Sequence, residues 1–306
     1  MLRSVSAAQK RADLRSALAG SQLLRLPGAI SPLSAMAIAD KGFEGVYVSG
    51  AVLAADLGLP DIGLTTLTEV SGRAGQIARV TSLPTLVDAD TGFGEPMNAA
   101  RTITVLEDAG LAGAHIEDQV NPKRCGHLDG KSVVDQRSAR QRIAAAANAR
   151  RDPNFLLIAR TDIRAISGLD AAIDRAKSLV DAGADAIFPE AMVDLAEFEA
   201  VANAVEVPVL ANMTEFGKSE LFTTTQLASA GVRLVIYPVT LLRLAMGEIE
   251  RSLESMAQAG TQQHLVGQMQ TRARLYELID YAGYNAFDAD IFTYSVPPDP
   301  EKGSRQ

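Results

Sequence analysis

Asp88 and Asp90 are the two side chains whose type and spacing most directly indicate chemistry. They lie two residues apart in the segment 84–90, which is predicted to be a strand, so both carboxylates would point to the same side. Like charges held so close raise a carboxyl pKa unless a cation lies between them. Mg²⁺ suits such a place because it commonly binds one or two protein carboxylates and keeps several waters. We therefore expect a magnesium site here, with a solvated strand end as the alternative.

A thiol is the second candidate for chemistry, because the chain has one cysteine, Cys125. Its neighbours Lys123, Arg124 and His127 would favour the thiolate and adjust it for proton transfer. Packing as a small apolar residue is the alternative for a lone cysteine. The surrounding connection, 119–134, has the length of a mobile lid that closes over a substrate. Cys125 and His127 are therefore candidate catalytic residues.

Polar residues end most of the other predicted strands as well. These endings are Ser49, Glu117 and Asp118, Arg160 and Asp162, Glu190, and Asn212 and Thr214. Some of them could be helix N-caps, but Glu and Arg are poor caps. In a closed barrel such positions converge on the face where active sites are built. A ring of functional side chains is therefore expected, with capping and loop solvation as the alternative.

Three arginines are candidate anion-binding residues, because a guanidinium binds a carboxylate through two hydrogen bonds. Arg160 ends a predicted strand, whereas Arg243 follows the last strand and Arg272 lies in the C-terminal tail. Position alone leaves the latter two equally suited to surface salt bridges. Two histidines, His115 within a strand and His264 in a linker, are expected to be structural.

Eight short apolar segments would position these side chains. They are 23–28, 45–49, 84–90, 113–118, 155–161, 186–190, 207–213 and 234–238, and helical stretches such as 99–109, 137–149, 169–182 and 194–204 alternate with them. Continuously apolar strands are typical of a parallel sheet buried on both faces. Eight such units predict an α/β fold, a TIM-type (β/α)8 barrel. A doubly wound open sheet is the alternative, although no G-x-G-x-x-G or P-loop motif supports a nucleotide-binding version of it.

Such a barrel takes about 250 residues, so helical additions are expected at both ends of the chain. Residues 6–20 read as a helix that ends at a glycine, although their Ser, Ala and Arg content also loosely resembles a transit peptide. The segment 268–284 predicts another helical stretch in the tail. We expect one domain over residues 1–306, with a helical C-terminal extension at about 240–295.

The composition excludes several classes of protein. The 306 residues are 47% apolar and 22% charged, as in an ordinary globular chain. No apolar run approaches the ~18 residues of a membrane span, and the net charge of −8 provides no basic surface for nucleic acid or an anionic membrane. One cysteine cannot form an internal disulfide, so a reducing, cytoplasmic compartment is expected.

Six motifs stand out along the chain. They are LVDADTGFG (86–94), HIEDQVNPKRCGH (115–127), IARTD (158–162), FPEA (188–191), LANMTEFG (210–217) and MQTRARLYELI (269–279). Together they resemble the 2-methylisocitrate lyases, which belong to the isocitrate lyase and phosphoenolpyruvate mutase superfamily. The resemblance runs from about residue 31 to residue 292 and is most specific at K-R-C-G-H. It implies a (β/α)8 barrel whose last helix is exchanged between the subunits of a homotetramer, with Mg²⁺ bound.

The resemblance also implies roles for individual residues. The metal ligands would be Asp88 and Asp90, with Glu117 and Asp61 in the outer shell. Substrate contacts would come from Ser49, Gly50, Ala51, Cys125, Gly126, Arg160, Glu190, Asn212, Thr214, Arg243 and Arg272. Tyr47 also matches an active-site position of the family and is a candidate catalytic residue.

The implied reaction is a retro-Claisen-type cleavage of (2S,3R)-2-methylisocitrate, a small tricarboxylate, to pyruvate and succinate, in the methylcitrate cycle of propionate catabolism. Mg²⁺ would bind the 2-hydroxyl and its neighbouring carboxylate, while arginine and amide donors would stabilise the charge that develops on the succinate fragment. Cys125 would then protonate the carbanion as general acid. Tyr47 and Glu190 are both candidates for removing the hydroxyl proton.

Isocitrate lyase and dimethylmalate lyase activities are the alternatives within the superfamily. Isocitrate lacks only one methyl group, and a pocket discriminates one methyl by about 1–3 kcal/mol, so cross-activity is expected. Isocitrate lyases are generally much longer chains, whereas dimethylmalate lyase would keep the cysteine. An alternative of another class is a non-catalytic carboxylate-binding barrel, which would not need a thiol beside two metal-binding acids.

Overall fold

The structure of the chain, a computed structural model, describes residues 5–124, 126 and 130–293. It divides into two compact units, one covering residues 4–260 and the other covering residues 1–3 and 261–306. The first unit contains the sheet, and the second contains short helices. Within the described ranges, no helix combines the length and hydropathy that a bilayer span requires.

Eight parallel strands form a barrel in the first unit. They are β1 (Leu24–Pro27), β2 (Val46–Val48), β3 (Thr85–Asp88), β4 (Gly113–Glu117), β5 (Leu156–Thr161), β6 (Ala186–Pro189), β7 (Val209–Asn212) and β8 (Val232–Tyr237). Neighbouring strands pair in the order β1-β8-β7-β6-β5-β4-β3-β2. A parallel bridge between Gly28 and Tyr47 joins β1 to β2 and nearly closes the ring. The predicted TIM-type barrel is confirmed, and the open-sheet alternative is wrong.

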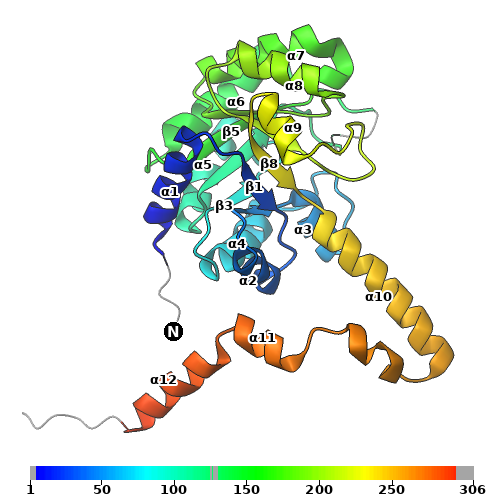
Figure 1. Ribbon diagram of the computed structural model, residues 1–306. Coiled ribbons are helices and arrows are strands. Elements are labelled where there is room, and N and C mark those ends of the chain that lie inside the picture. The colour runs from blue at the N-terminus through cyan, green and yellow to red at the C-terminus, as the bar shows by residue number, and fades with distance from the viewer. Residues whose placement is uncertain (1–4, 125, 127–129, 294–306) are drawn as a thin grey trace, which may run out of the picture. The chain divides into compact units, whose positions relative to one another are not determined.

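Helices alternate with the strands and surround them (Figure 1). They are α2 (Pro32–Asp40), α3 (Gly50–Asp56), α4 (Leu67–Arg79), α5 (Pro96–Asp108), α6 (Gln136–Ala149), α7 (Arg164–Asp181), α8 (Leu195–Ala204) and α9 (Thr224–Ser229). Gly110 and Gly183 lie just past the ends of α5 and α7, with φ of 86° and 106°. Positive φ is costly for a residue with a Cβ, so glycine turns the chain from the helix into the next strand.

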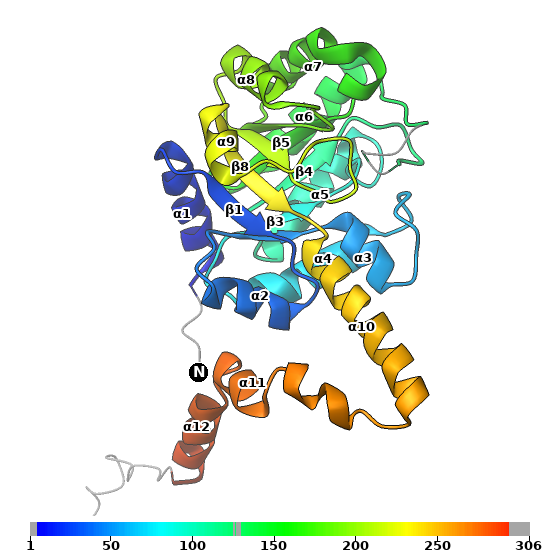
Figure 2. The ribbon, with the colours of Figure 1, turned by 45° about the vertical axis from the view of Figure 1, so that its right-hand side comes forward.

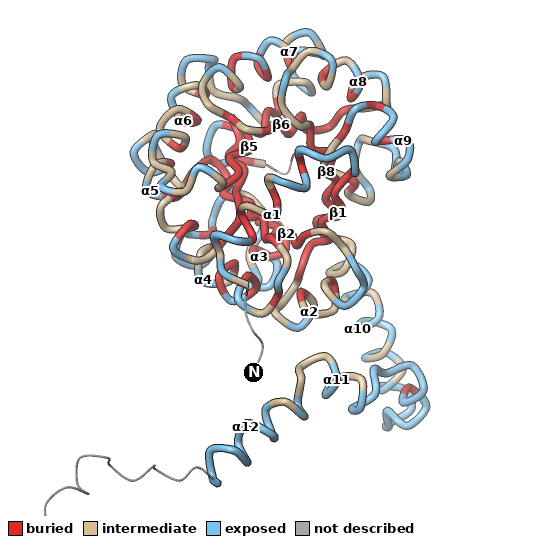
Figure 3. The backbone as a smooth tube through the Cα atoms, turned by 60° about the vertical axis from the view of Figure 1, so that its left-hand side comes forward, coloured by how far each residue is buried: buried red, intermediate tan, exposed pale blue. Residues whose placement is uncertain are grey.

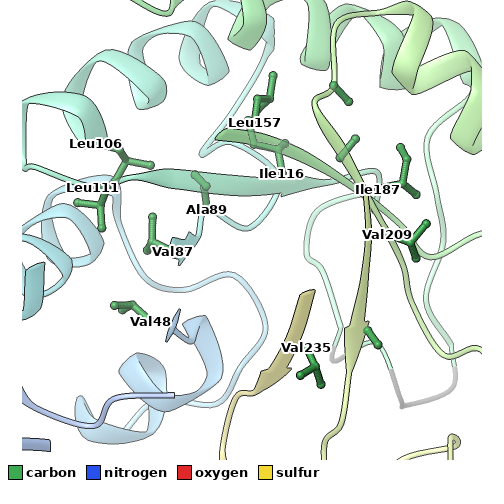
Figure 4. Packing of buried hydrophobic residues seen from close by; sticks show 14 of the residues in the cluster. Val48, Val87, Ala89, Leu106, Leu111, Ile116, Leu157, Ile187, Val209 and Val235 are labelled. Carbon is green, nitrogen blue, oxygen red and sulfur yellow. The ribbon is translucent and has the colours of Figure 1, made fainter. Parts of the chain in front are cut away.

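Apolar side chains cover both faces of the strands. The outer layer packs the strands against the helices and includes Val48, Val87 and Ile187 (Figure 4). The inner layer fills the barrel itself and includes Leu86 and Leu156. Most strand residues are consequently buried, which accounts for their continuously apolar sequences. The packed strands give rigid support to the polar residues that follow them.

Helix α1 (Ala7–Ala19) lies across the N-terminal end of the barrel (Figure 3). Its Leu14 and Leu18 are buried among the inner-layer residues. Lys10 and Arg11 donate hydrogen bonds to backbone carbonyls around the connections into β3 and β4. The predicted N-terminal helix is therefore present, and it closes this end of the barrel. Any site must open at the carboxyl ends of the strands.

Helix α10 (Thr240–Ala259) follows β8 but projects away from the barrel (Figure 2). None of its residues is buried. Its exposed apolar side chains are Leu244, Met246, Ile249, Leu253 and Met256. An amphipathic helix of this kind normally buries its apolar face against another element.

The second unit contains a 3₁₀ helix (Gln263–Gln268), α11 (Arg272–Leu278) and α12 (Tyr281–Thr293). The expectation of one helical stretch over 268–284 is therefore only partly met, because the helix breaks at Asp280. The φ of Asp280 is 54°, a left-handed conformation that cannot continue an α-helix. The expectation of a single domain over the whole chain stays a prediction.

Candidate active site

The carboxyl ends of the strands surround a polar cavity at the open end of the barrel. The residues that line it are Tyr47, Ser49, Ala51, Asp61, Asp88, Lys123, Arg124, Gly126, Arg160, Phe188, Glu190, Asn212, Thr214, Ile236, Pro238, Val239 and Arg243. Many of the side chains expected from the sequence are among them. The cavity contains negative, positive and apolar surface, as a site for an organic anion and a cation would require.

Asp88 and Asp90 follow the apolar part of β3, and both carboxylates are buried. Asp88 accepts hydrogen bonds from the backbone N–H groups of Asp90 (2.9 Å) and Gly50 (3.3 Å). Burial and then the charge of Asp88 raise the pKa of Asp90 to about 6. Burial would also raise the pKa of Asp88, but its electrostatic interactions with His115 and with the charged Lys123 help to bring it below its usual value. The pair therefore combines concentrated negative charge with restricted access to water.

Lys123 is the cation nearest to this pair. Its Nζ lies 2.7 Å from Oδ1 of Asp90 and 2.5 Å from Oδ1 of Asp61. Burial alone would lower the pKa of Lys123, but Asp88 and the other surrounding carboxylates raise it. Lys123 is therefore charged and neutralises part of the charge of the acidic group.

The residues around Asp88 and Asp90 fit Mg²⁺. A Cβ on Gly50 would lie 2.8 Å from Oδ2 of Asp88 and 3.4 Å from Oδ1 of Asp90, so glycine leaves space beside both carboxylates. In the part of the chain that the structure describes, no three His, Cys, Asp or Glu side chains are grouped to hold a metal ion by themselves. A two-carboxylate site relies on water and substrate oxygens for the remaining ligands, which is a coordination common for Mg²⁺.

The guanidinium of Arg160 is surrounded by three buried carboxylates. It forms two hydrogen bonds with Asp162, at 3.0 and 3.1 Å. Its Nε also lies 3.3 Å from Oε2 of Glu117 and 3.8 Å from Oε2 of Glu190. Burial would lower the pKa of Arg160, but these carboxylates raise it. Arg160 is therefore a permanently charged and firmly oriented group, as binding of a carboxylate requires.

Tyr47 lines the cavity, and the buried His115 lies beside it. The Tyr47 hydroxyl is 2.7 Å from Nε2 of His115, which is 3.7 Å from Oδ1 of Asp88. Burial lowers the pKa of His115 to about 4, so its imidazole is neutral at pH 7. Burial also raises the pKa of Tyr47 well above its usual value, so the phenol keeps its proton. His115, expected to be structural, thus contacts two predicted site residues.

The connection after β4 brings Gly126 against the site. A Cβ on Gly126 would lie 2.5 Å from Oε1 of Glu190 and would also meet Arg160, so no larger residue fits this position as it stands. Cys125 and His127, the two catalytic candidates of this connection, lie outside the described residues. Their roles stay predictions.

Other predicted site residues have different surroundings. The Ser49 side chain caps α3 by accepting from the N–H of Val52 at 3.5 Å. Nδ2 of Asn212 lies 3.4 Å from Oε1 of Glu190, next to Arg160. Arg243 lines the cavity but contacts Glu215, at 2.8 Å. Arg272 is the first residue of α11 and belongs to the second unit, so its predicted contact with substrate stays a prediction.

Sequence reasoning did not single out Lys123, Phe188 or Ile236 as site residues. The sequence indicates only an effect of Lys123 on the neighbouring thiol, because its partners Asp61 and Asp90 are distant in sequence. The motif K-R-C-G-H could have drawn attention to it. Phe188 and Ile236 line the cavity beside Tyr47 and give it an apolar wall. Phe188 and Ile236 lie in continuously apolar strands, so nothing in the local sequence distinguishes them from ordinary buried strand residues.

Known proteins are similar to this chain in sequence and in fold. Residues 14–257 match the family described as phosphoenolpyruvate phosphomutase. The chain is 61% identical to the probable 2-methylisocitrate lyase 2 of Corynebacterium glutamicum, over 96% of this chain and 95% of that protein. It is similar to the crystal structure of 2,3-dimethylmalate lyase, with a TM-score of 0.87 and 32% identity over 96% of this chain and 99% of that one. A phosphonopyruvate hydrolase complex with oxalate and Mg²⁺ is also similar, with a TM-score of 0.82 and 26% identity over 95% and 99% of the two chains.

Proposed function

The chain belongs to the phosphoenolpyruvate phosphomutase family, and we infer that it is a carbon–carbon lyase that cleaves 2-methylisocitrate to pyruvate and succinate. The observation that carries this inference is the 61% identity to a probable 2-methylisocitrate lyase along nearly the whole chain. The barrel adds a site of suitable chemistry, with a carboxylate pair, a buried guanidinium and an apolar wall. No observation favours isocitrate lyase, dimethylmalate lyase or a non-catalytic barrel.

The cavity suits a small tricarboxylate that also carries apolar carbon. Arg160 and Lys123 supply fixed positive charge, and Arg243 adds a third cation at the lining. Phe188 and Ile236 offer apolar surface on which a methyl group can pack. Recognition thus combines charge for the carboxylates with a smaller apolar contribution for the methyl group, which is worth about 1–3 kcal/mol.

Asp88 and Asp90 would hold Mg²⁺, with Glu117 and Asp61 in the outer shell. When bound, Mg²⁺ polarises the hydroxyl and carboxylate oxygens of the substrate. Its presence in the phosphonopyruvate hydrolase complex and the donor chemistry of this carboxylate pair support the proposal. Lys123 would remain beside Asp90 and Asp61 and keep the net charge of this acidic group low.

Cleavage requires one proton to leave the substrate hydroxyl and one proton to reach carbon. As the C–C bond breaks, the oxygen retains the electrons of its O–H bond and forms the ketone of pyruvate, while the bonding pair passes to the succinate fragment. Because Tyr47 keeps its proton, it suits hydrogen-bond donation, and the carboxylate of Glu190 is the better candidate for accepting the hydroxyl proton. The thiol of Cys125 would protonate the carbanion, and Arg160 would stabilise the charge on the carboxylate.

We further propose that α10 is exchanged between the subunits of a homotetramer. A largely apolar groove of about 690 Å³ lies on the outside of the barrel, with Ile30, Ile38, Phe43 and Leu241 among its lining residues. The exposed apolar side chains of α10 would be buried if a second copy placed this helix in the groove. The predicted contact of Arg272 with the substrate would form in this tetramer. A reducing cytoplasm suits an enzyme that needs a free thiol. Release of pyruvate and succinate suits a place in the methylcitrate cycle.

Direct assay of the products tests this function. Purified protein should release pyruvate and succinate in equal amounts from 2-methylisocitrate when Mg²⁺ is present, and EDTA should abolish release. Isocitrate and 2,3-dimethylmalate should be poorer substrates. The variant Cys125→Ser should bind substrate in calorimetry but lose turnover. Absence of both products from the Mg²⁺-loaded enzyme would overturn the proposed function, and full turnover by Cys125→Ser would remove the thiol from the mechanism.

A further inference from the structure

We propose that Lys131 is a positioning residue that seats Gly126 against Arg160. The side chain of Lys131 is only 3% exposed, although lysine is almost never buried without a partner. Its Nζ lies 3.1 Å from Oδ1 of Asp162 and also donates a hydrogen bond to the backbone carbonyl of Gly126. One ammonium group therefore joins the connection after β4 to the end of β5.

Lys131 and Arg160 share a single carboxylate. Oδ1 of Asp162 lies 3.1 Å from the Nη2 of Arg160 and 3.1 Å from the Nζ of Lys131, and the carboxylate is completely buried. Without Lys131, the guanidinium would be the main cation facing Asp162, Glu117 and Glu190. Lys131 therefore balances charge around the group that is proposed to bind substrate, and any displacement of its ammonium group changes the environment of Arg160.

The two ends of the same connection are fixed independently. The carboxylate of Asp118 accepts hydrogen bonds from the N–H of Asp162 (2.9 Å) and the hydroxyl of Thr161 (2.7 Å). Arg175 contacts Asp118 at 2.8 Å and donates to the carbonyl of Val134 at 3.1 Å. These contacts anchor the base of the connection. The contact between Lys131 and Gly126 instead fixes its interior, where Gly126 meets Arg160.

If the chain is the proposed lyase, this arrangement means that Lys131 affects the reaction in a specific way. Gly126 is the next residue after Cys125, the proposed proton donor. Because Cys125 is bonded directly to Gly126, holding Gly126 against Arg160 and Glu190 restricts the positions that the proposed proton donor can take. Loss of Lys131 should consequently reduce kcat far more than it raises KM, because a misplaced catalytic group costs up to about 10²-fold in rate.

The test combines kinetics with the reactivity of the sole cysteine. Lys131→Met should lower kcat by about 10²-fold with KM within about threefold, and should raise the rate of Cys125 alkylation by iodoacetamide about tenfold. Lys131→Arg should restore both values substantially, because it keeps the positive charge. The exposed Lys177 supplies the matched control, since Lys177→Met should match wild type in both measurements.

Unchanged kcat and alkylation in Lys131→Met would overturn the proposal. A lower kcat with unchanged alkylation, or with no rescue by Lys131→Arg, would also overturn it, because the defect would then not concern seating of the segment. If circular dichroism shows Lys131→Met unfolded, Lys131→Gln takes its place and the same outcomes decide. Alkylation needs no substrate, so this readout still tests the seating if the protein fails to cleave 2-methylisocitrate.

Discussion

The ammonium group of Lys123 lies 2.7 Å from Oδ1 of Asp90, inside the acidic group proposed to bind Mg²⁺. The lysine is on the connection after β4, whereas the aspartate follows β3, so this ion pair joins two different connections of the expected site. It also means that a protein cation and a metal ion would neutralise the same carboxylates. The relative contributions of Lys123 and Mg²⁺ to this neutralisation can be measured.

Replacing Lys123 by Met should increase the stabilisation that Mg²⁺ provides. Without the ammonium group, the repulsion among Asp61, Asp88 and Asp90 is less compensated, and an ion that binds only the folded state gains affinity. We expect the rise in Tm on adding Mg²⁺ to be roughly 1–2 °C larger than in wild type, which corresponds to about 1 kcal/mol. Differential scanning fluorimetry measures it, with Lys177→Met as control. An equal Mg²⁺ shift in both proteins would contradict this expectation.

Gly126→Ala should impair catalysis while the fold is retained. The added Cβ would lie 2.5 Å from Glu190 and meet Arg160, so the segment or these side chains must move. We expect kcat to fall at least about tenfold, because reacting groups lose their alignment. Gly72→Ala on α4 is the matched control, since its Cβ meets nothing within 4 Å and should stabilise the helix by about 0.5–1 kcal/mol. Wild-type kcat in Gly126→Ala would show that the segment does not need this close approach.

Asp118→Asn should change how stability depends on pH. Burial, together with the charge of Asp162, raises the pKa of Asp118 from 3.8 to about 6 in the folded state. The folded protein therefore holds this proton more tightly than the unfolded chain, and the associated stability is present below pH 4 and lost as the pH rises to 6. The free energy of unfolding of wild type should fall relative to that of the variant by roughly 2–2.5 kcal/mol between pH 4 and 7.

Urea unfolding at several pH values measures this difference. The effect of Asp118 ionisation is the change with pH in the difference between the unfolding free energies of the two proteins. A constant cost of losing the ion pair with Arg175 does not affect this change. A gap that stays the same from pH 4 to pH 7, or widens in favour of wild type, would show that Asp118 ionises normally in the folded protein.

Leu253→Lys should weaken the proposed assembly. This side chain is 59% exposed on α10, so the barrel itself should be unaffected, but burial of a leucine at a subunit contact is worth about 1.5–3 kcal/mol. Light scattering after size-exclusion chromatography should show a smaller mass than wild type at the same concentration. Gln258→Lys, at an exposed position of the same helix, controls for the one added charge. An unchanged mass would place Leu253 outside any subunit contact.

The barrel and the positions of its strand ends could be predicted because two physical signals agree. Strands buried on both faces are continuously apolar, and Gly110 and Gly183 mark where helices give way to strands. The polar residues that end these strands, such as Asp88 and Arg160, then fall on one rim by the geometry of a closed parallel sheet. The general chemistry of the site follows from local sequence.

Four features could not be predicted in the same way. The ion pairs of Lys123 depend on contacts between loops far apart in sequence, and His115 has the same apolar neighbours as any interior strand residue. No glycine marks the left-handed conformation of Asp280, so the sequence pattern predicts one helical stretch where the structure has α11 and α12. The apolar pattern of α10 shows that one face must be covered but not which surface covers it.

Closure of one end of the barrel by α1, through Leu14 and Leu18, has a kinetic consequence. The substrate and both products must pass through the one open end of the barrel. The product bound nearer that end therefore has to leave before the more deeply bound one. Release should then be sequential, and the last fragment to leave should compete directly with incoming reactant. Inhibition by the other fragment should instead be noncompetitive, which would reveal the order of departure from steady-state measurements alone.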